Sequence, residues 1–195
     1  MAEPAPCFGA GDPDYLAYHD REWGRPVRDE RGIYERLCLE GFQSGLSWLT
    51  ILRKRPAFRE AFAGFDPDAV SAFGPDDVEA LLTNAAIVRH RGKIEAAIAN
   101  ARATLALRAA GTPLHEIVWA AHADAVGPVP ESFAQLPSST DASIALARQL
   151  GRAGFRFVGP TTVYSTMQAC GVVNDHLAGC PVRAEVERER SAPVS

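Results

Sequence analysis

The sequence predicts an all-α fold made of many short helices, and two observations support that prediction. Helix-start signals are dense, because a capping residue or a turn glycine precedes a proline at Asp12-Pro13, Asp66-Pro67, Gly74-Pro75 and Thr112-Pro113. Apolar residues recur three and four positions apart, as in the runs Ile33, Leu37, Gly41 and Ile94, Ile98, Ala101, Leu105. The alternation of apolar and polar residues that marks a half-buried strand does not occur.

The expected helices follow these signals along the chain. In order they cover residues 13–23, 30–41, 45–54, 57–63, 67–73, 76–83, 91–109, 113–122, 140–150, 161–170 and 174–180. Three prolines predict a surface loop over residues 123–139. The tail from Arg183 is charged and has no apolar face, so residues 183–195 are expected to be disordered. Residues 1–182 are long enough for a single domain of two interleaved helical lobes.

The composition is that of an ordinary soluble globular protein. The hydrophobic share is 47% and the charged share 23%. No apolar run approaches the roughly 18 residues of a membrane span, so we expect a cytoplasmic protein without membrane contact. The net charge of −4 argues against a polyanionic partner. Basic residues nevertheless gather in the runs Arg53-Lys54-Arg55 and Arg89-His90-Arg91-Gly92-Lys93, which are either solvated faces or a phosphate-binding stripe.

The four cysteines are expected to be reduced thiols or metal ligands rather than disulfides. Two of them stand in apolar helical stretches and are assigned to the core, Cys38 and Cys170. His176 and Cys180 are four apart on an expected helical turn and would point the same way. Cys7 and His19 would complete a Cys₂His₂ set near the other end of the chain, which suits tetrahedral zinc. The spacing is not that of a zinc finger, so an exposed histidine with unrelated thiols is the alternative.

Five runs of the sequence resemble the 3-methyladenine DNA glycosylase I family. They are YLAYHDREWG (15–24), CLEGFQSGLSW (38–48), IVRHRGKI (87–94), FRFVGPTT (155–162) and MQACGVVNDH (167–176). The resemblance extends from about residue 7 to residue 180. It implies a helix-hairpin-helix DNA glycosylase fold in which a structural Zn²⁺, held by Cys7, His19, His176 and Cys180, joins the two termini. It also implies DNA base-excision repair, in which the enzyme hydrolyses the N-glycosidic bond of 3-methyladenine in alkylated double-stranded DNA.

The resemblance assigns the base pocket to four residues. Glu40 is the expected catalytic residue, accepting hydrogen bonds from the exocyclic amine. Tyr15, Tyr18 and Trp48 are the expected stacking walls, and Trp23 is either a wall or core. N3-alkylation gives adenine a positive charge, and a cation over electron-rich rings gains about 0.5–2 kcal/mol. Ordinary half-buried core is the alternative interpretation of each aromatic residue.

The resemblance also assigns the contacts to DNA. The glycine turn that opens a helix at Val158, Gly159 and Thr161 would bind phosphate through its backbone, and Gly45-Leu46 would fill the gap left by the flipped base. Neighbouring phosphates are assigned to the basic residues Arg89, Arg91 and Lys93. For Leu46, ordinary packing is an equal alternative. Asp175 lies near the place of a catalytic Asp in the wider superfamily, but the family resembled here does not depend on one.

Lysine is scarce, with Lys54 and Lys93 against eighteen arginines, and neither lies in the hairpin region where helix-hairpin-helix lyases carry theirs, which favours simple hydrolysis over a Schiff-base lyase. The protein is expected to be a monomer. Phe8 follows Cys7 where the family commonly shows Gly-Trp, and Phe42 stands where glutamine is common. Either change could alter which alkylated base is preferred. Two other classes compete with the enzyme: a non-catalytic helix-hairpin-helix protein that binds damaged DNA, and a zinc-thiol protein in redox or metal handling.

Overall fold

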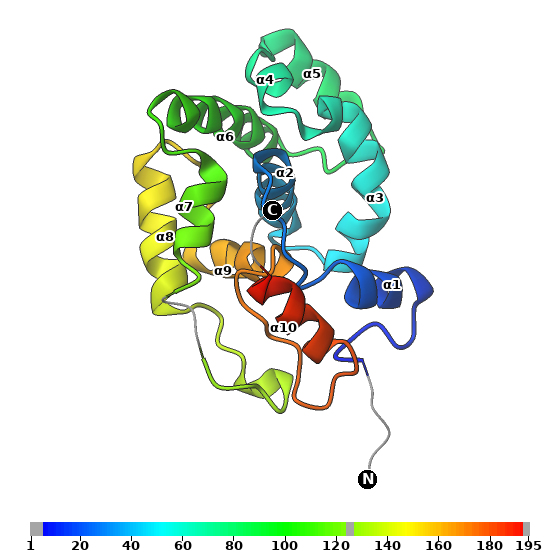
Figure 1. The fold of residues 1–195 in the computed structure, drawn as a ribbon. Helices are drawn as coiled ribbons and strands as arrows, with labels where there is room; N and C mark the ends of the chain where they lie inside the picture. The colour runs from blue at the N-terminus through cyan, green and yellow to red at the C-terminus, as the bar shows by residue number, and fades with distance from the viewer. Residues whose placement is uncertain (1–5, 124–126, 193–195) are drawn as a thin grey trace.

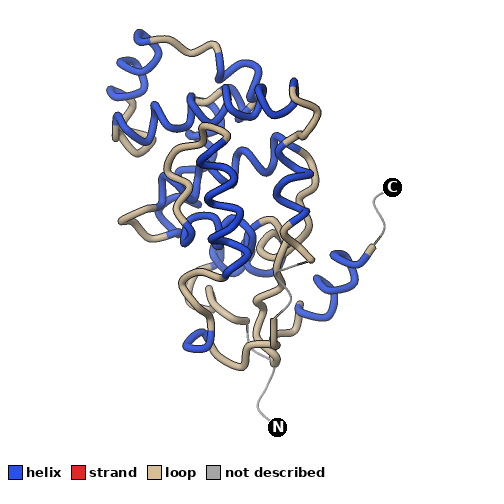
Figure 2. Tube along the Cα trace, turned by 90° about the vertical axis from the view of Figure 1, so that its left-hand side faces the viewer, coloured by secondary structure: helices blue, strands red, loops and turns tan. Residues whose placement is uncertain are grey.

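The computed structural model describes residues 6–123 and 127–192, and over these ranges the protein is all-helical, as predicted. The helices are α1 (Pro13–Arg21), α2 (Glu30–Gln43), α3 (Trp48–Ala61), α4 (Pro67–Ser71), α5 (Pro75–Thr83), α6 (Arg91–Ala109), α7 (Leu114–Ala120), α8 (Asp141–Arg152), α9 (Pro160–Ala169) and α10 (Arg183–Ser191). Two short 3-10 turns, η1 (Ala63–Phe65) and η2 (Phe133–Gln135), complete the elements. Figure 2 shows helices joined by loops, with no strand among the described residues.

The helix starts follow the capping signals of the sequence. Asp12 accepts hydrogen bonds from the backbone N–H groups of Asp14 and Tyr15 at 3.1 Å, and Asp29 accepts one from Gly32 at 2.7 Å. Prolines occupy the first position of α1, α4, α5 and α9, where the missing N–H costs nothing. Local chemistry therefore sets where these helices begin.

Helix α2 lies in the middle of the molecule, between α3–α5 on one side and α6–α8 on the other (Figure 1). Its side chains Ile33, Tyr34 and Leu37 are fully or nearly fully buried in one continuous apolar cluster. The buried hydroxyl of Tyr34 donates a hydrogen bond to the carbonyl of Ala97 at 2.9 Å, so it does not lack a partner. Cys38 and Cys170 belong to this core, as predicted.

Three expectations about secondary structure are wrong. The helices expected at 45–54 and 57–63 are one helix, α3, which continues through Pro56 because Phe58 beyond it is fully buried. The segment expected as a helix at 174–180 is an irregular loop with one turn at residues 178–179. The tail expected to be disordered forms α10 over Arg183–Ser191, while residues 193–195 of that tail lie outside the described residues.

Long-range contacts explain the order of α10. Val186 is fully buried, and Arg25 pairs with Glu185 at 3.0 Å. The Arg190 guanidinium donates to the carbonyls of Gly171 at 2.6 Å and Val172 at 2.8 Å. These contacts bring α10 beside the N-terminal segment at the lower end of the molecule (Figure 1). Over the described ranges, no helix combines the length and apolar character needed to cross a membrane.

Candidate active site and metal centre

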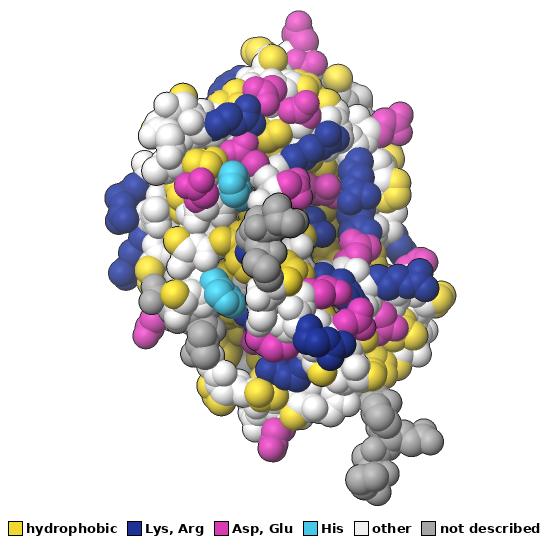
Figure 3. Space-filling model, in the orientation of Figure 1, with side chains coloured by type: hydrophobic (Ala, Val, Ile, Leu, Met, Phe, Trp, Pro, Cys, Tyr) yellow, Lys and Arg dark blue, Asp and Glu magenta, His cyan; other side chains and the backbone are white. Residues whose placement is uncertain are grey.

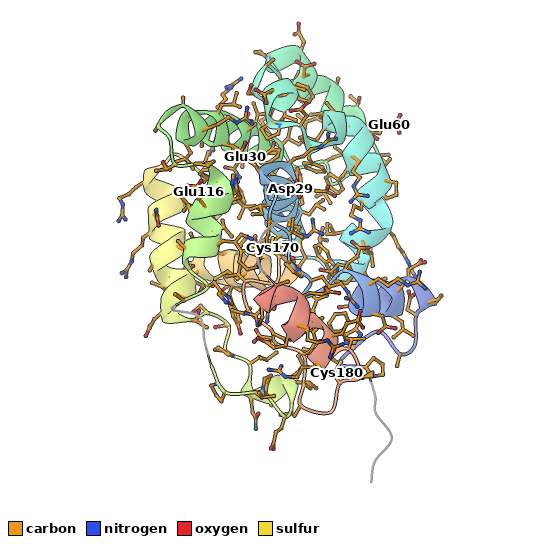
Figure 4. The ribbon with its side chains drawn as sticks, in the orientation of Figure 1. Asp29, Glu30, Glu60, Glu116, Cys170 and Cys180 are labelled. Atoms are coloured by element: carbon orange, nitrogen blue, oxygen red, sulfur yellow. The ribbon has the colours of Figure 1, made fainter. Side chains whose placement is uncertain are left out.

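Four side chains from the two ends of the chain converge on one point. The potential ligand atoms of Cys7, His19, His176 and Cys180 all lie within 4.8 Å of one another. Cys7 precedes α1, His19 lies in α1, and the other two stand in the loop before α10. Figure 4 labels Cys180 at the lower end of α10, where the N-terminal segment passes. The convergence therefore arises from tertiary packing, since His176 and Cys180 do not share a helix as expected.

The spacing of these atoms fits a tetrahedral metal ion. The Cys180 Sγ lies 3.5 Å from His19 Nε2 and 3.4 Å from His176 Nδ1, and the Cys7 Sγ lies 3.6 Å from His176 Nδ1. Zinc bonds of roughly 2.3 Å to sulfur and roughly 2.0–2.1 Å to nitrogen give sulfur–nitrogen edges of about 3.6 Å in a tetrahedron. The distances between the side chains are thus those that a shared zinc ion requires.

The second nitrogen of each histidine is held by a neighbour. His19 Nδ1 contacts Asp20 Oδ1 at 2.7 Å, and His176 Nε2 contacts the carbonyl oxygen of Trp23 at 3.0 Å. Such partners fix the tautomer, so that the nitrogen facing the metal centre carries no proton and can bind a metal. Burial lowers the pKa of His176 to about 4, so its ring is neutral at pH 7, as a ligand must be.

An aromatic cluster adjoins the metal centre. Tyr18 and Trp48 lie with ring centroids 5.3 Å apart, and Phe8 lies 4.8 Å from Tyr15 and 5.0 Å from Trp23. The ring of Phe8 also packs edge-to-face against that of His19 in the metal centre, with the ring centroids 4.8 Å apart. The two sites therefore share a wall, and the residue that stands where the family has Gly-Trp is part of it.

Glu40 is buried close to two of these aromatic residues, Tyr15 and Tyr18. Only 6% of its surface is exposed, and burial raises the pKa of its carboxyl to about 8. Its charge contributes, after burial, to raising the pKa values of Tyr15 and Tyr18, and it also raises that of Cys170 at the end of α9. The structure thus brings Glu40, Tyr15 and Tyr18 together, with Trp48 beside Tyr18. The indole Nε1 of Trp48 is buried and has no hydrogen-bond partner among the described residues.

The raised pKa of Glu40 makes a prediction about stability. Below the ordinary pKa of 4.5, the carboxyl is protonated in both the folded and the unfolded chain. As the pH rises from 4.5 to about 8, only the unfolded chain ionises, so the wild type loses free energy of unfolding. Glu40→Gln removes this cost, and we expect it to be more stable than the wild type by up to about 3 kcal/mol at pH 7.

Urea unfolding of both proteins at pH 4.5 and pH 8 measures this effect. The advantage of Glu40→Gln should be small at the lower pH and largest at the higher one. An equal difference at both pH values would show that the carboxyl ionises normally in the folded protein.

Other residues singled out in the sequence have different surroundings. Phe42 packs in the main core, with its ring centroid 4.6 Å from that of Phe58, and not in the aromatic cluster that contains Tyr18. Trp23 is buried and lies 4.6 Å from the ring of His176, beside the metal centre. The Asp175 carboxylate accepts hydrogen bonds from the Tyr164 hydroxyl and from the Gln168 amide.

The segments expected to meet DNA are mostly exposed. Gly45 has a φ of +84° and Leu46 after it is 42% exposed. Gly159 and Thr161 are exposed at the start of α9, which begins without a side-chain cap, while the Val158 side chain is buried. Val158 can therefore reach a phosphate only through its backbone.

The expected cations differ from one another. Arg89 is exposed, and no ion pair involves it among the described residues. Arg91 is also exposed and pairs with Glu79 at 2.7 Å. The expectation that Lys93 binds phosphate is wrong. Only 8% of the residue is exposed, and its ammonium donates to the carbonyls of Phe42 at 3.0 Å and Ser44 at 2.6 Å. Lys93 is thus removed from the phosphate-binding set.

Sequence reasoning missed two residues near this surface, Asn100 and Phe157. Asn100 is buried in α6 and hydrogen-bonds the backbone of Arg156. Phe157 is exposed with a φ of +55°. The run FRFVG marked the region, but nothing local connects it to Asn100.

A large cavity lies away from the aromatic cluster. It measures about 1340 Å³ and is lined by the loop around Pro128 and Pro137, by Asp175, and by α10. Glu40 and Tyr18, in contrast, are buried, while Tyr15 and Trp48 in the same cluster are half-buried. Tyr15 and Trp48 are therefore the members of this group that solvent reaches.

Comparisons with known proteins agree with this arrangement. The family model described as Methyladenine glycosylase matches residues 8–184. DNA-3-methyladenine glycosylase 1 of Escherichia coli (strain K12) is 50% identical over 171 residues, 87% of this chain and 91% of that protein. A crystal structure of 3-methyladenine DNA glycosylase I has a TM-score of 0.88 at 49% identity, covering 91% of this chain and 98% of that one. A variant in complex with 3-methyladenine has a TM-score of 0.86 at 35% identity, covering 91% and 96%.

The family model and the relative each cover most of the chain. The residues that the family model matches include the metal-centre histidines, Glu40 and the aromatic cluster around it. The resemblance seen in the sequence is therefore confirmed, and the chain belongs to the methyladenine glycosylase family.

Proposed function

We propose that this protein is a DNA repair glycosylase that hydrolyses the N-glycosidic bond of 3-methyladenine in alkylated double-stranded DNA, acting as a monomer. The observation that carries the proposal is the buried carboxyl of Glu40 beside Tyr15, Tyr18 and Trp48. One family member has been crystallised in complex with 3-methyladenine, which is the ligand expected at this place.

The site favours a cationic purine over a neutral one. Aromatic faces attract a cation by about 0.5–2 kcal/mol, and a neutral adenine gains little from them. Glu40 can accept hydrogen bonds from the exocyclic amine, and a nearby positive charge favours its ionised form. Since the alkylated base is already a good leaving group, the protein has to hold the base, exclude bulk water and admit one water to the sugar carbon.

The flipped base has to pass Tyr15 and Trp48, because Glu40 and Tyr18 are buried. The unpaired Nε1 of Trp48 is a donor that a ligand acceptor could satisfy on binding. Strand cleavage is not expected, since neither lysine serves as a Schiff-base nucleophile. Lys93 is engaged by backbone carbonyls, and Lys54 donates to the carbonyls of Ala85 and Ala86.

We assign the metal centre to a structural Zn²⁺ held by Cys7, His19, His176 and Cys180. When bound, the ion would supply a cross-link between the N- and C-terminal segments, and four protein ligands leave it no open position for substrate. The fit of the sulfur–nitrogen distances and the two held histidine nitrogens support the assignment. Metal analysis of the purified protein should give about one zinc per chain.

DNA is expected to bind through the α8–turn–α9 segment as a helix-hairpin-helix element. Backbone N–H groups at Gly159 and Thr161 would face a phosphate, and Arg89 and Arg91 would bind neighbouring ones. Leu46 would fill the gap left by the flipped base. On the face in Figure 3, Lys and Arg alternate with Asp and Glu, so the α10 face offers no continuous cationic surface.

The proposal is tested by incubating the protein with methylated duplex DNA and identifying free bases by chromatography. We expect release of 3-methyladenine without strand breaks, and Trp48→Ala should release less. Binding of the duplex with no base released would instead support a non-catalytic protein that senses damaged DNA.

A further inference from the structure

Helix α6 makes hydrogen bonds to two segments that the proposed function assigns to DNA, the turn after α2 and the turn between α8 and α9. Lys93 and Asn100 are seven positions apart, so they lie two turns apart on the same face of the helix. They are 8% and 3% exposed, and both direct their polar atoms at backbone outside α6. Buried polar side chains of this kind fix the backbone that they contact.

Lys93 holds the end of α2. Its ammonium bonds the carbonyls of Phe42 at 3.0 Å and Ser44 at 2.6 Å, among the last carbonyls of the helix, which have no partner within it. The backbone N–H of Leu46 closes the following turn on the carbonyl of Gln43 at 2.6 Å. The exposed Leu46 side chain is thereby presented from a fixed turn.

Asn100 holds the turn between α8 and α9 in the same way. Its Oδ1 accepts from the N–H of Arg156 at 2.7 Å, and its Nδ2 donates to the carbonyl of the same residue at 3.1 Å. The next residue, Phe157, has a φ of +55° and is 42% exposed. A left-handed backbone is unfavourable for an aromatic residue, and here burial of the ring does not offset it.

The two held segments are neighbours. A Cβ placed on Gly41 in α2 would lie 3.6 Å from the Cβ of Phe157. One small recess is lined by both segments and by α6, including Gly41, Phe42, Lys93, Asn100, Arg156 and Phe157. Each held turn therefore carries an exposed large apolar side chain, Leu46 or Phe157, and the segments that carry them meet at Gly41 and Phe157.

We propose that Phe157 is a second apolar side chain that contacts DNA beside Leu46, and that Lys93 and Asn100 are positioning residues that hold these two contacts from one helix. The inference rests on the proposed function, because it supposes that this surface meets duplex DNA. Proteins that open a base step often insert an apolar side chain there, and an aromatic ring can stack on an exposed base. An exposed ring held in a strained backbone suits that task better than it suits packing.

The first test uses Phe157→Gly, which removes the ring and relieves the left-handed backbone, so folding should not suffer. We expect an equal or higher Tm and about tenfold weaker binding to a duplex with a tetrahydrofuran abasic-site analogue, measured by fluorescence anisotropy. Binding of free 3-methyladenine, measured by calorimetry, should not change. Duplex binding equal to that of the wild type would overturn the role of Phe157.

The second test uses Lys93→Met and Asn100→Leu, with Thr104→Val as the matched control. Thr104 is a fully buried polar residue of α6 that bonds only within its own helix, to the carbonyl of Asn100 at 2.8 Å. We expect the two test variants to lose about tenfold in duplex affinity while binding the free base normally, and Lys93→Arg to retain wild-type affinity. Thr104→Val should match the wild type in both assays.

Equal losses of duplex and free-base affinity in the test variants would indicate a general defect in folding and overturn the positioning role. The wild type serves as the check on the underlying function. If it releases no 3-methyladenine from methylated DNA, the proposed function fails. If it does so while all variants bind the duplex normally, only the present inference fails.

Discussion

Replacing Glu40 with glutamine should lower kcat/KM for release of 3-methyladenine at pH 7 by about 100-fold. A carboxylate and a cationic purine about 4 Å apart attract by about 4 kcal/mol at an effective dielectric constant of about 20. At pH 7 a carboxyl with a pKa of about 8 must first be ionised, and this costs about 1.4 kcal/mol of the attraction. The remaining about 3 kcal/mol corresponds to the expected loss.

The loss should appear mainly in KM. Positive charge is shared between the purine and the sugar throughout bond breaking, so the carboxylate stabilises the bound state and the transition state alike. Glu35→Gln is a matched control, because Glu35 is a second buried glutamate of α2 but is paired with Arg59 at 2.7 Å. That variant should retain wild-type kinetics where it is folded.

The dependence of kcat/KM on pH shows whether Glu40 acts through its negative charge or only through its shape. Wild-type kcat/KM should rise about tenfold between pH 7 and pH 9, as the carboxyl ionises without help from the substrate. The profile of Glu40→Gln should be flat over this interval. Tyr15 and Tyr18 do not titrate here, because burial raises their pKa values further above 10. A flat wild-type profile would contradict the role assigned to the charge.

Local chemistry explains how much of the fold the sequence could predict. Helix starts at Pro13, Pro67 and Pro75 depend on the residue and its immediate neighbours, and they lie at or within one residue of the expected positions. The four metal-centre residues could be proposed from their types and from family resemblance. Their actual convergence depends on the loop between α9 and α10. The spacing of His176 and Cys180 had wrongly indicated a helix there.

What the sequence could not predict depends on contacts between distant segments. α10 has a single buried apolar residue, Val186, and its order comes from partners such as Arg25 and the carbonyl of Gly171. Lys93 has the same appearance in the sequence as a phosphate-binding lysine. Only the packing of α6 on the end of α2 shows that its ammonium is already occupied.

Among the changes considered, removal of the metal should lower the stability of the fold most. The four ligands join residues 7 and 180 of the chain, so the ion would close a loop that spans nearly the whole fold. Structural zinc sites contribute about 10–16 kcal/mol of binding energy in small peptides, against a total stability of about 5–15 kcal/mol for a domain. We expect Cys180→Ser, or prolonged chelation of the wild type, to lower Tm by at least about 10 °C.

The control is Cys38→Ala, which removes a buried thiol outside the metal centre and should cost only the lost packing, roughly 1–2 kcal/mol. An unchanged Tm after chelation of a protein shown to contain zinc would contradict the structural role. Chelation should also weaken binding of free 3-methyladenine, because Phe8 touches both His19 and Tyr15. The aromatic pocket and the metal centre share that wall, so releasing one end of the chain should loosen the surface on which the base stacks.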